Sequence, residues 1–192
     1  MPAVEHSAVA RLPTYDPVTQ ALNVVIETPA GCRNKFEYDK DSGLFMLHSI
    51  LPNGAVFPFD FGFIPGTCGQ DGDPLDVLVL MDEPAFTGCL LRVRLIGVLE
   101  AEEIEDGQKE RNDRLVAVAT ESHDHRDIHN LDQLNPNLVH EFEHFFTSYE
   151  ALKQRQFKIL GQHGPKRAEN LVEAARTGSR AKHGRTSARK VK

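Results

Sequence analysis

The sequence predicts a single, mainly β domain that also carries two helices, which is an α+β fold. Between residues 22 and 119 it is a succession of short apolar or alternating runs separated by glycine, proline, asparagine and aspartate. Such runs are typical of strands joined by turns. After residue 136 apolar residues recur every three or four positions, which indicates a helix. The length of 192 residues, with 40% hydrophobic and 26% charged residues, fits one globular domain.

The clearest strand pair is a hairpin near the N-terminus. Residues 35–40 alternate, so Lys35 and Glu37 lie on one face and Phe36 and Tyr38 on the other. The turn at residues 41–43 predicts that this strand pairs with residues 44–47. The other predicted β segments are residues 22–28, an aromatic run at 56–65, a buried strand at 77–80, a strand at 90–99, an acidic hairpin at 100–107, and strands at 115–119 and 157–160.

Two helices are expected in the C-terminal part of the chain. The first runs from Pro136 to about residue 154, with Asn135 as its N-cap and Pro136 at its first position. The second runs from Pro165 to about residue 177. The apolar stripe of the first helix is predicted to consist of Leu138, Phe142, Phe145, Tyr149 and Leu152.

Charge is unevenly distributed along the chain. The formal net charge is −6, and seven basic residues from Arg176 onward, with no acid among them, contribute +7, which leaves −13 for the rest. An acidic body suits an enzyme that recruits metal cations and makes nucleic-acid binding an unfavoured function. Residues 1–20 are expected to form an extended arm, residues 21–177 the domain, and residues 178–192 a basic, disordered tail.

The composition also indicates a cellular compartment. Cys32, Cys68 and Cys89 are an odd number without the spacing of a metal site, so they are expected to be reduced thiols. The N-terminus does not have the pattern of a secretory signal, and no apolar run is long enough to span a bilayer. We therefore expect a cytoplasmic protein that does not enter a membrane.

Three aspartates stand within six residues, in the stretch Asp71-Gly72-Asp73-Pro74-Leu75-Asp76 that leads into the buried strand. Carboxylates this close repel one another unless water or hard cations neutralise them, and their oxygens suit Mg²⁺ or Mn²⁺. A solvated acidic turn is the alternative. Asp76 enters a segment that is expected to be buried, where a carboxylate needs a partner, and this favours the metal site.

The stretch from Asp71 to Val77 resembles the signature of the soluble (type I) inorganic pyrophosphatases, and the similarity extends over residues 23–157. The resemblance implies a closed, OB-like, five-stranded β-barrel with two main flanking helices. It implies a hydrolase that splits diphosphate into two orthophosphates with Mg²⁺, or Mn²⁺ as the alternative ion. It also implies a homo-oligomer, either a dimer or a hexamer.

The same resemblance implies roles for individual residues. Asp73 would be the catalytic carboxylate that orients or deprotonates the attacking water. The implied metal ligands are Asp71, Asp76 and Glu37, joined by acidic or amide groups of the second hairpin. The residues implied to hold substrate are Lys35, Arg114, Tyr149 and Glu27.

The second hairpin matches the family pattern only loosely. Asn112 stands where the family has an aspartate, and Asp113 stands next to it. A shift of one residue on a strand points the side chain to the opposite face. Another family aspartate corresponds to either Glu103 or Asp106. All four residues are therefore candidate metal ligands.

The phosphate pocket departs further from the family. Ser49, with His48 beside it, replaces an arginine; Phe57 and Phe61 replace tyrosines; Glu150 replaces a lysine. From charge alone, Lys166 or Arg167 could replace the lost cations. The chain is thus identified as a divergent member, and three alternatives stay open. These are a weakly active metal- or phosphate-binding relative, a hydrolase of another phosphate compound, and an oligonucleotide-binding module.

A loop rich in histidine and aspartate is a further candidate metal site. Its spacing fits no defined coordination set, so a polar surface loop or a subunit contact is the favoured interpretation over a transition-metal site. Its residues are His123, Asp124, His125, Asp127 and His129.

Overall fold

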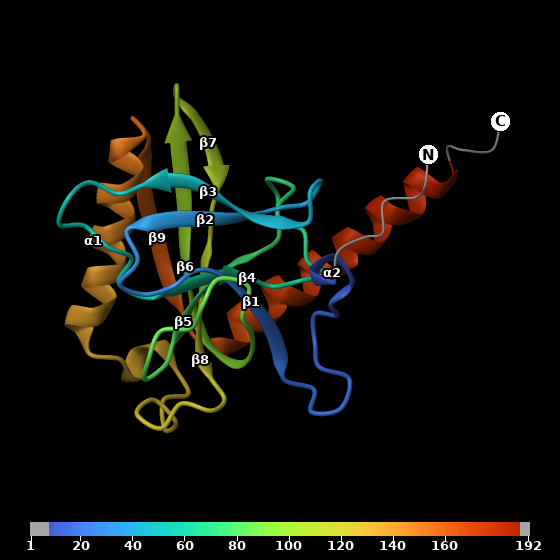
Figure 1. Ribbon diagram of the computed structural model, residues 1–192, viewed down its shortest axis with the longest axis horizontal. Coiled ribbons are helices and arrows are strands. Elements are labelled where there is room, and N and C mark those ends of the chain that lie inside the picture. Colours follow the sequence, from blue (N-terminus) through green and yellow to red (C-terminus); the bar gives the residue numbers. More distant parts are fainter. Residues whose placement is uncertain (1–7, 189–192) are drawn as a thin grey trace.

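The computed structural model describes residues 8–188, and for residues 177–188 it describes the backbone alone. The centre of the molecule is a ring of five strands. The pairing order is β1 (Leu22–Thr28), β4 (Asp60–Phe63), β5 (Asp76–Leu80), β8 (Arg114–Ala119) and β6 (Leu90–Glu105). β6 also pairs with β1, which closes the ring (Figure 1). The β5–β8 pair is parallel and the others are antiparallel. The predicted mainly β fold with a curled five-stranded sheet is confirmed.

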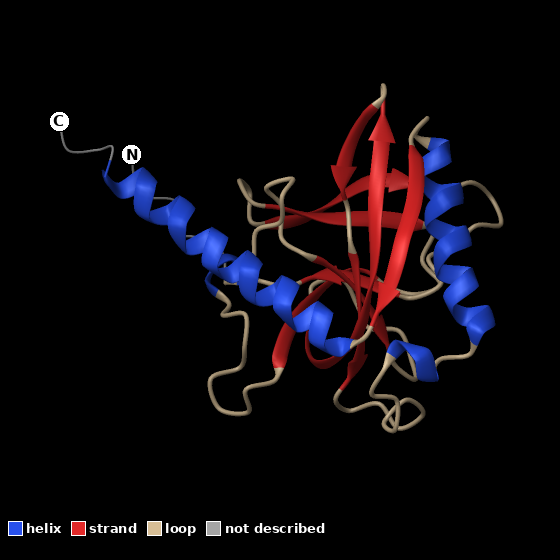
Figure 2. Cartoon of the chain, turned by 180° about the vertical axis from the view of Figure 1, so that it is seen from behind, coloured by secondary structure: helices blue, strands red, loops and turns tan. Residues whose placement is uncertain are grey.

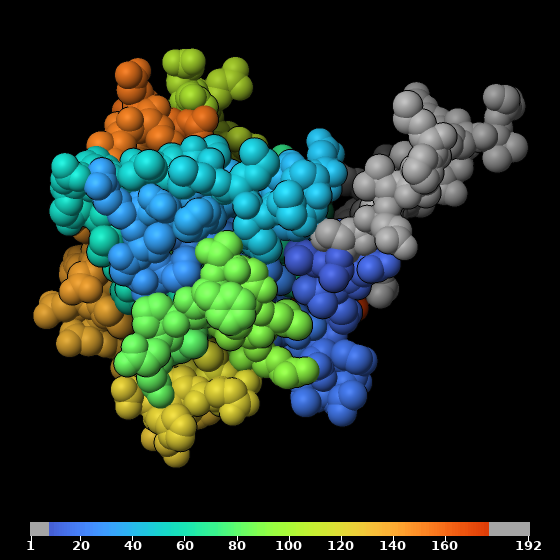
Figure 3. Space-filling model, viewed as in Figure 1, coloured from blue at the N-terminus to red at the C-terminus, as the bar shows by residue number. Residues whose placement is uncertain are grey.

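Further strands extend this ring on one side. β6 continues beyond it and pairs with β7 (Gln108–Arg111) and β9 (Gln156–His163). The predicted hairpin is formed by β2 (Asn34–Asp39) and β3 (Leu44–Ile50), with Asp39 opposite Leu44. In the space-filling view this hairpin crosses the face in blue and cyan (Figure 3).

Several predicted strand ends were wrong. β3, β6 and β9 reach Ile50, Glu105 and His163, beyond the expected residues 47, 99 and 160, while β4 begins only at Asp60. β6 is long because β7 and β9 pair with its two edges, so its acidic residues remain hydrogen-bonded in a sheet. Strand length here is decided by pairing rather than by side-chain polarity.

The core is divided into two apolar clusters. β5 sends Val77 and Val79 into one cluster and Leu78 and Leu80 into the other. Because both faces of β5 are buried, its sequence is a continuous apolar run instead of an alternating one. Gly62 on β4 allows close packing against β1, since a Cβ atom there would collide with the backbone oxygen of Val25.

Helix α1 (Pro136–Leu152) covers one side of the sheet, next to β9 (Figure 1). The predicted cap is confirmed, because the Asn135 side chain accepts from the amide of Asn137. The predicted stripe needs correction: Val139 and Phe146 are buried, whereas Leu152 is exposed. The helix buries a face that includes 139, 142, 146 and 149, so the stripe predicted to run to 152 leaves the interface in the last turn.

Helix α2 (Pro165–Ala188) packs on the other core cluster through Ala168 and Val172. It then leaves the body as one continuous helix (Figure 2). The helix was expected to end near residue 177, but residues 178–188 continue it, which corrects the prediction of a disordered tail there. Residues 189–192 of that tail lie outside the described part. No helix in the described part is long and apolar enough to cross a membrane.

The N-terminal arm is more structured than expected. Residues 1–7 lie outside the described residues, and a 3-10 turn follows at Val9–Arg11. Asp16 then accepts hydrogen bonds from the amides of Val18 and Thr19 and pairs with Arg92 at 2.7 Å. These contacts dock residues 14–22 onto the sheet, so this part is not a free extended arm.

Candidate active site

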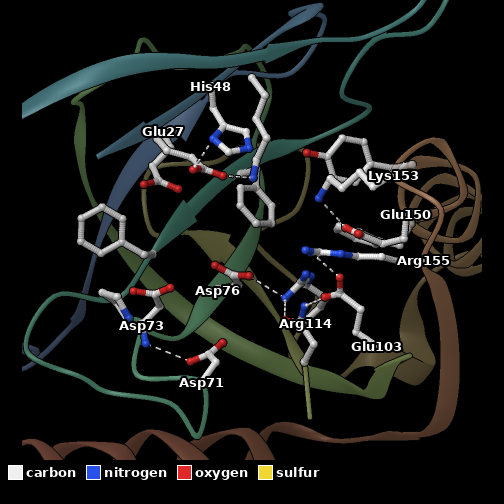
Figure 4. A pocket seen from close by; sticks show the side chains of 18 of the residues that line it. Glu27, His48, Asp71, Asp73, Asp76, Glu103, Arg114, Glu150, Lys153 and Arg155 are labelled. Carbon is white, nitrogen blue, oxygen red and sulfur yellow. Dashed lines mark hydrogen bonds and ion pairs between the residues drawn. The ribbon is translucent and has the colours of Figure 1, made fainter. Parts of the chain in front are cut away.

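A cavity of about 480 Å³ opens between the β2–β3 hairpin, the 71–76 loop, the β6–β7 hairpin and the C-terminal end of α1 (Figure 4). Of the twelve residues predicted for the site, ten line this cavity: Glu27, Lys35, Glu37, Asp71, Asp73, Asp76, Glu103, Asn112, Arg114 and Tyr149. Segments far apart in the sequence therefore supply one space.

The two remaining candidates lie elsewhere. Asp106 occupies the β6–β7 turn with φ +49°, beside Gly107 at φ +79°, and does not line the cavity. Asp113 accepts from the amide of Ala101 at 3.0 Å and pairs with Arg111 at 2.9 Å. Asn112 lines the cavity in its place; both residues lie in the short link between β7 and β8, where the Asp113 side chain is turned to the Ala101 amide. The metal-ligand assignment of Asp106 and Asp113 therefore finds no support in their placement.

The acidic loop is shaped by a left-handed glycine. Gly72 has φ +94°, a conformation that other residues rarely adopt. Asp71 accepts a hydrogen bond from the amide of Asp73 at 2.9 Å. The Asp73 side chain is 74% exposed and pairs with Lys40 at 2.7 Å. The loop thus presents two solvent-facing carboxylates at the cavity edge.

Asp76, the first residue of β5, lies deeper in the cavity. Its Oδ2 accepts from Nη1 of Arg114 at 2.5 Å, and the same guanidinium also donates to Asn112. Burial raises the pKa of Asp76, while Arg114 and Lys35 act to lower it. The Arg114 guanidinium lies 5.0 Å from the Phe146 ring centroid, so aromatic packing fixes it in place.

Lys35 is placed beside an irregularity in the β2–β3 pairing, where the register shifts between Lys35 and Phe36. Its ammonium forms an ion pair with Glu37, and Glu37 also meets Nδ1 of His48 at 2.9 Å. Burial opposes the charge, but Tyr149 and Glu37 raise the pKa of Lys35. Lys35 therefore remains a cation inside the cavity.

Two aromatic residues line the same part of the cavity. Phe61 stands where the family has a tyrosine. Its ring centroid lies 5.9 Å from Lys35 Nζ and 5.8 Å from the Arg114 guanidinium carbon. It therefore contacts both cations through its ring instead of a hydroxyl. The Tyr149 hydroxyl is buried and has no hydrogen-bond partner among the described residues.

Glu27 reaches the cavity from a bulge. The β1–β4 register shifts between Ile26 and Thr28, which re-aims the side chain between them. Glu27 accepts from the amide of Tyr38 at 2.8 Å. Burial raises its pKa to about 8, against the smaller effect of that hydrogen bond. Glu27 is therefore largely protonated at neutral pH.

The C-terminal end of α1 supplies Glu150, which the sequence marks as a departure from the family, and two residues that sequence reasoning missed, Lys153 and Arg155. Glu150 is buried and pairs with Lys153 at 3.0 Å. Arg155 binds Glu103 at 2.8 Å (Figure 4), and it also binds Glu105 at 3.0 Å. The only signal in the sequence was the three-residue spacing of Glu150 and Lys153, which places them on one helix face. Other missed residues of the lining include Lys40, Glu110 and Arg111, while His48 had been noted beside the departure at Ser49.

The suggestion that Lys166 or Arg167 replaces the lost cations was wrong. Arg167 pairs with Glu100 at 2.6 Å, and neither residue lines the cavity. The loop at residues 123–129 is organised by Asp82, which accepts from the amides of His123 and Asp124. None of that loop lines the cavity.

The donor set of the cavity fits hard cations, because carboxylate and amide oxygens dominate it. Across the described side chains, no three His, Cys, Asp or Glu residues converge closely enough to hold an ion. The acids are instead engaged by protein cations: Asp76 by Arg114, Asp73 by Lys40, and Glu37 by Lys35. An ion binding here would exchange places with these partners.

Comparison with known proteins agrees with this geometry. The family model described as inorganic pyrophosphatase matches residues 24–179. The chain belongs to the inorganic pyrophosphatase family. It is 38% identical to the inorganic pyrophosphatase of Synechocystis over 152 residues, which are 79% of this chain and 87% of that protein. It is 37% identical to soluble inorganic pyrophosphatase 2 of Chlamydomonas reinhardtii, over 79% of this chain and 77% of that protein.

Solved structures of the family share the fold. The inorganic pyrophosphatase from Thermus thermophilus superposes with a TM-score of 0.82 at 33% identity, covering 90% of this chain and 98% of the other. The enzyme from Helicobacter pylori gives a TM-score of 0.77 at 31% identity, covering 83% and 94%. Within this pyrophosphatase, the departures at Phe61 and Glu150 lie on the cavity wall, while Ser49 does not line it and His48 does.

Proposed function

We propose that this chain hydrolyses inorganic diphosphate to two orthophosphates with a divalent cation. The observation that carries the proposal is the arrangement of one cavity: the Asp71–Asp76 carboxylates lie at one side, and Lys35, Arg114 and Tyr149 lie together beyond them. Carboxylates suit the cation and the basic groups suit the phosphate oxygens. Both requirements of the reaction meet in a space large enough for a small anion.

The residues that would hold the cation, Mg²⁺ or alternatively Mn²⁺, are Asp71 and Asp76, with Glu37, Glu103 and Asn112 as further oxygen donors. When bound, a divalent ion neutralises phosphate charge and lowers the pKa of water. Arg114 would release Asp76 and turn to the substrate. Because the Phe146 ring also contacts the guanidinium, Arg114 would stay within the cavity when that ion pair opens.

Asp73 is the residue proposed to orient and deprotonate the attacking water. Its side chain is 74% exposed, and Lys40, 54% exposed, is its ion-pair partner. Exposed pairs of this kind contribute little and open readily. Asp73 is therefore available to accept a proton at the cavity mouth, close to the other loop carboxylates.

On the substrate side, Lys35 and Arg114 are proposed to hold phosphate oxygens and Tyr149 to donate its hydroxyl to one. The burial of these groups excludes water, which strengthens each contact. Glu27, with its raised pKa, would remain protonated near neutral pH and could donate as well. The substrate would thus supply the acceptor that the Tyr149 hydroxyl lacks in the free protein.

The test is phosphate release from diphosphate by the purified chain with Mg²⁺, with Mn²⁺ and with a chelator. Asp73→Asn is expected to lower kcat by about 10²–10⁴-fold with an unchanged Tm. Asp41→Asn, at an exposed turn, is the matched control and should keep full activity. Unchanged turnover in Asp73→Asn would refute the role of Asp73. No release from folded protein with either ion would favour a weakly active relative or another phosphate substrate.

The chain is further expected to act in the cytoplasm as a homo-oligomer, either a dimer or a hexamer. Exposed apolar side chains on β3, at Leu44, Met46 and Ile50, support a subunit contact. Light scattering measures this state directly. A monomer at micromolar concentration would contradict it.

A further inference from the structure

The end of α1 carries two opposite charges on the cavity wall. The Lys153 ammonium lies 3.0 Å from Oε1 of Glu150, whose side chain is 2% exposed. Lys153 itself is 30% exposed. Burial raises the pKa of Glu150 and the Lys153 ammonium acts to lower it, so the pair holds the ammonium at the wall beside the carboxyl (Figure 4).

The same ammonium faces groups of the substrate side. Lys153 Nζ lies 4.1 Å from the Tyr149 ring centroid, and Lys35 Nζ lies 5.8 Å from it. The Tyr149 hydroxyl is buried without a partner among the described residues. Two ammonium groups and one unused hydroxyl donor around one ring fit an oxyanion, which accepts from all three.

We propose that Lys153 is a phosphate-binding residue of this chain and that Glu150 is the positioning residue that holds its ammonium beside Tyr149. This inference rests on the proposed function and names the cation that serves the α1 end of the cavity. Resemblance to the family places a lysine at position 150, where this chain has Glu150. The structure shows a positive charge 3.0 Å from that carboxylate, so the charge is supplied from three residues further along the chain.

Local geometry explains how the charge reaches this place. Residues three apart on a helix share a face, so positions 150 and 153 point the same way. Lys153 directly follows the last helical residue, and its amide donates to the carbonyl of Glu150 at 3.0 Å. The chain then reverses at Gln154 with φ +64°. The backbone of Lys153 is thereby fixed while its long side chain extends to the Tyr149 ring.

A purely structural ion pair is the competing interpretation. It would make Lys153 matter for stability but not for substrate affinity. A phosphate-binding role instead requires weaker binding of a diphosphate analogue and a KM that rises more than kcat falls. The two interpretations therefore differ in a quantity that can be measured directly.

The first experiment is calorimetric titration with imidodiphosphate, a non-hydrolysable analogue, in Mg²⁺, together with steady-state kinetics. Lys153→Gln is expected to weaken analogue binding about tenfold or more and to raise KM similarly, the effect of one lost charge-assisted hydrogen bond. Lys158→Gln, an exposed lysine of β9 outside the cavity, is the matched control. Wild-type affinity and KM in folded Lys153→Gln would overturn the proposal.

The second experiment exchanges the two charges. Lys153→Glu alone is expected to weaken analogue binding by about 30-fold or more, and adding Glu150→Lys should restore most of it. A folded double variant that binds as weakly as Lys153→Glu overturns the proposal; if the double variant does not fold, Lys153→Gln decides. Binding of the analogue does not depend on hydrolysis. If the wild-type chain binds the analogue, Lys153→Gln binds it more weakly, and the wild-type chain does not hydrolyse diphosphate, only the proposed function is refuted.

Discussion

The loop at residues 71–76 and the α1 wall, defined as Tyr149, Glu150, Lys153 and Arg155, lie on different sides of the same cavity, and both carry ion pairs. On the loop, Asp73 is 74% exposed and its partner Lys40 is 54% exposed. On the α1 wall, Glu150 is 2% exposed and its partner Lys153 30%. The two regions use similar pairs in opposite surroundings.

The difference in burial predicts a difference in behaviour. An exposed pair contributes about 0–1 kcal/mol and exchanges its partner readily. A buried pair is costly to break, because the remaining charge has no water to replace its partner. The loop can therefore give up Lys40 for a cation from solution, whereas the α1 wall keeps its charges in fixed positions for the substrate.

The largest effect on stability is expected at Arg114, which contacts both Asp76 of the loop and the Phe146 ring of α1. Arg114→Met leaves Asp76 in the cavity without its guanidinium and should lower the free energy of unfolding by about 3–5 kcal/mol. Urea unfolding measures this change. Adding Asp76→Asn should recover part of the loss, since no unpaired, half-buried carboxylate remains, but activity should stay low. A fully stable Arg114→Met variant would contradict the role of Arg114 as a buried partner.

The contrast between the two sides also explains what could be predicted from the sequence. The loop is one short contiguous stretch, so its residue types, its glycine and its entry into a strand are all visible in order. The alternation of Lys35 and Glu37 on one strand face is equally local. These residues were predicted, and the structure brings them into one cavity.

The α1 wall depends on contacts that no local pattern reveals. Arg155 meets Glu103 only because β9 returns antiparallel along β6, and the two residues are 52 positions apart. Asn112 and Asp113 are adjacent in the link between β7 and β8, yet Asn112 lines the cavity while Asp113 bonds to the Ala101 amide and to Arg111. Charge alone suggested Lys166 and Arg167, which the fold carries away from the site.

Glu27 differs from the acids of both regions, because its carboxyl forms no ion pair with the other described residues of the cavity and accepts from the Tyr38 amide instead. Glu27 retains its proton up to about pH 8 in the folded chain, while an ordinary glutamate releases it near 4.5. Between these values the folded state binds more protons than the unfolded state, so the free energy of unfolding falls as pH rises. The slope from this group is at most about 1.4 kcal/mol per pH unit.

Glu27→Gln should remove that slope. Urea unfolding of both proteins at pH 5, 6, 7 and 8, with a chelator present, gives the difference between them. The variant is expected to gain stability relative to the wild type as pH rises across this window. A difference that does not depend on pH would show that Glu27 ionises normally.

The smallest effect is expected at Tyr149, whose hydroxyl should affect the stability of the free protein and the affinity for substrate in opposite directions. Its hydroxyl is buried without a partner among the described residues, so Tyr149→Phe removes an unsatisfied polar group. Stability of the free protein should stay equal or rise by up to about 1 kcal/mol, since removing an unpaired buried hydroxyl removes its desolvation cost. Substrate binding should weaken about 5–10-fold, because the hydroxyl finds its acceptor only in the phosphate. Thermal unfolding and KM measure the two effects, and a loss of stability with an unchanged KM would mean that the hydroxyl serves the fold and not the substrate.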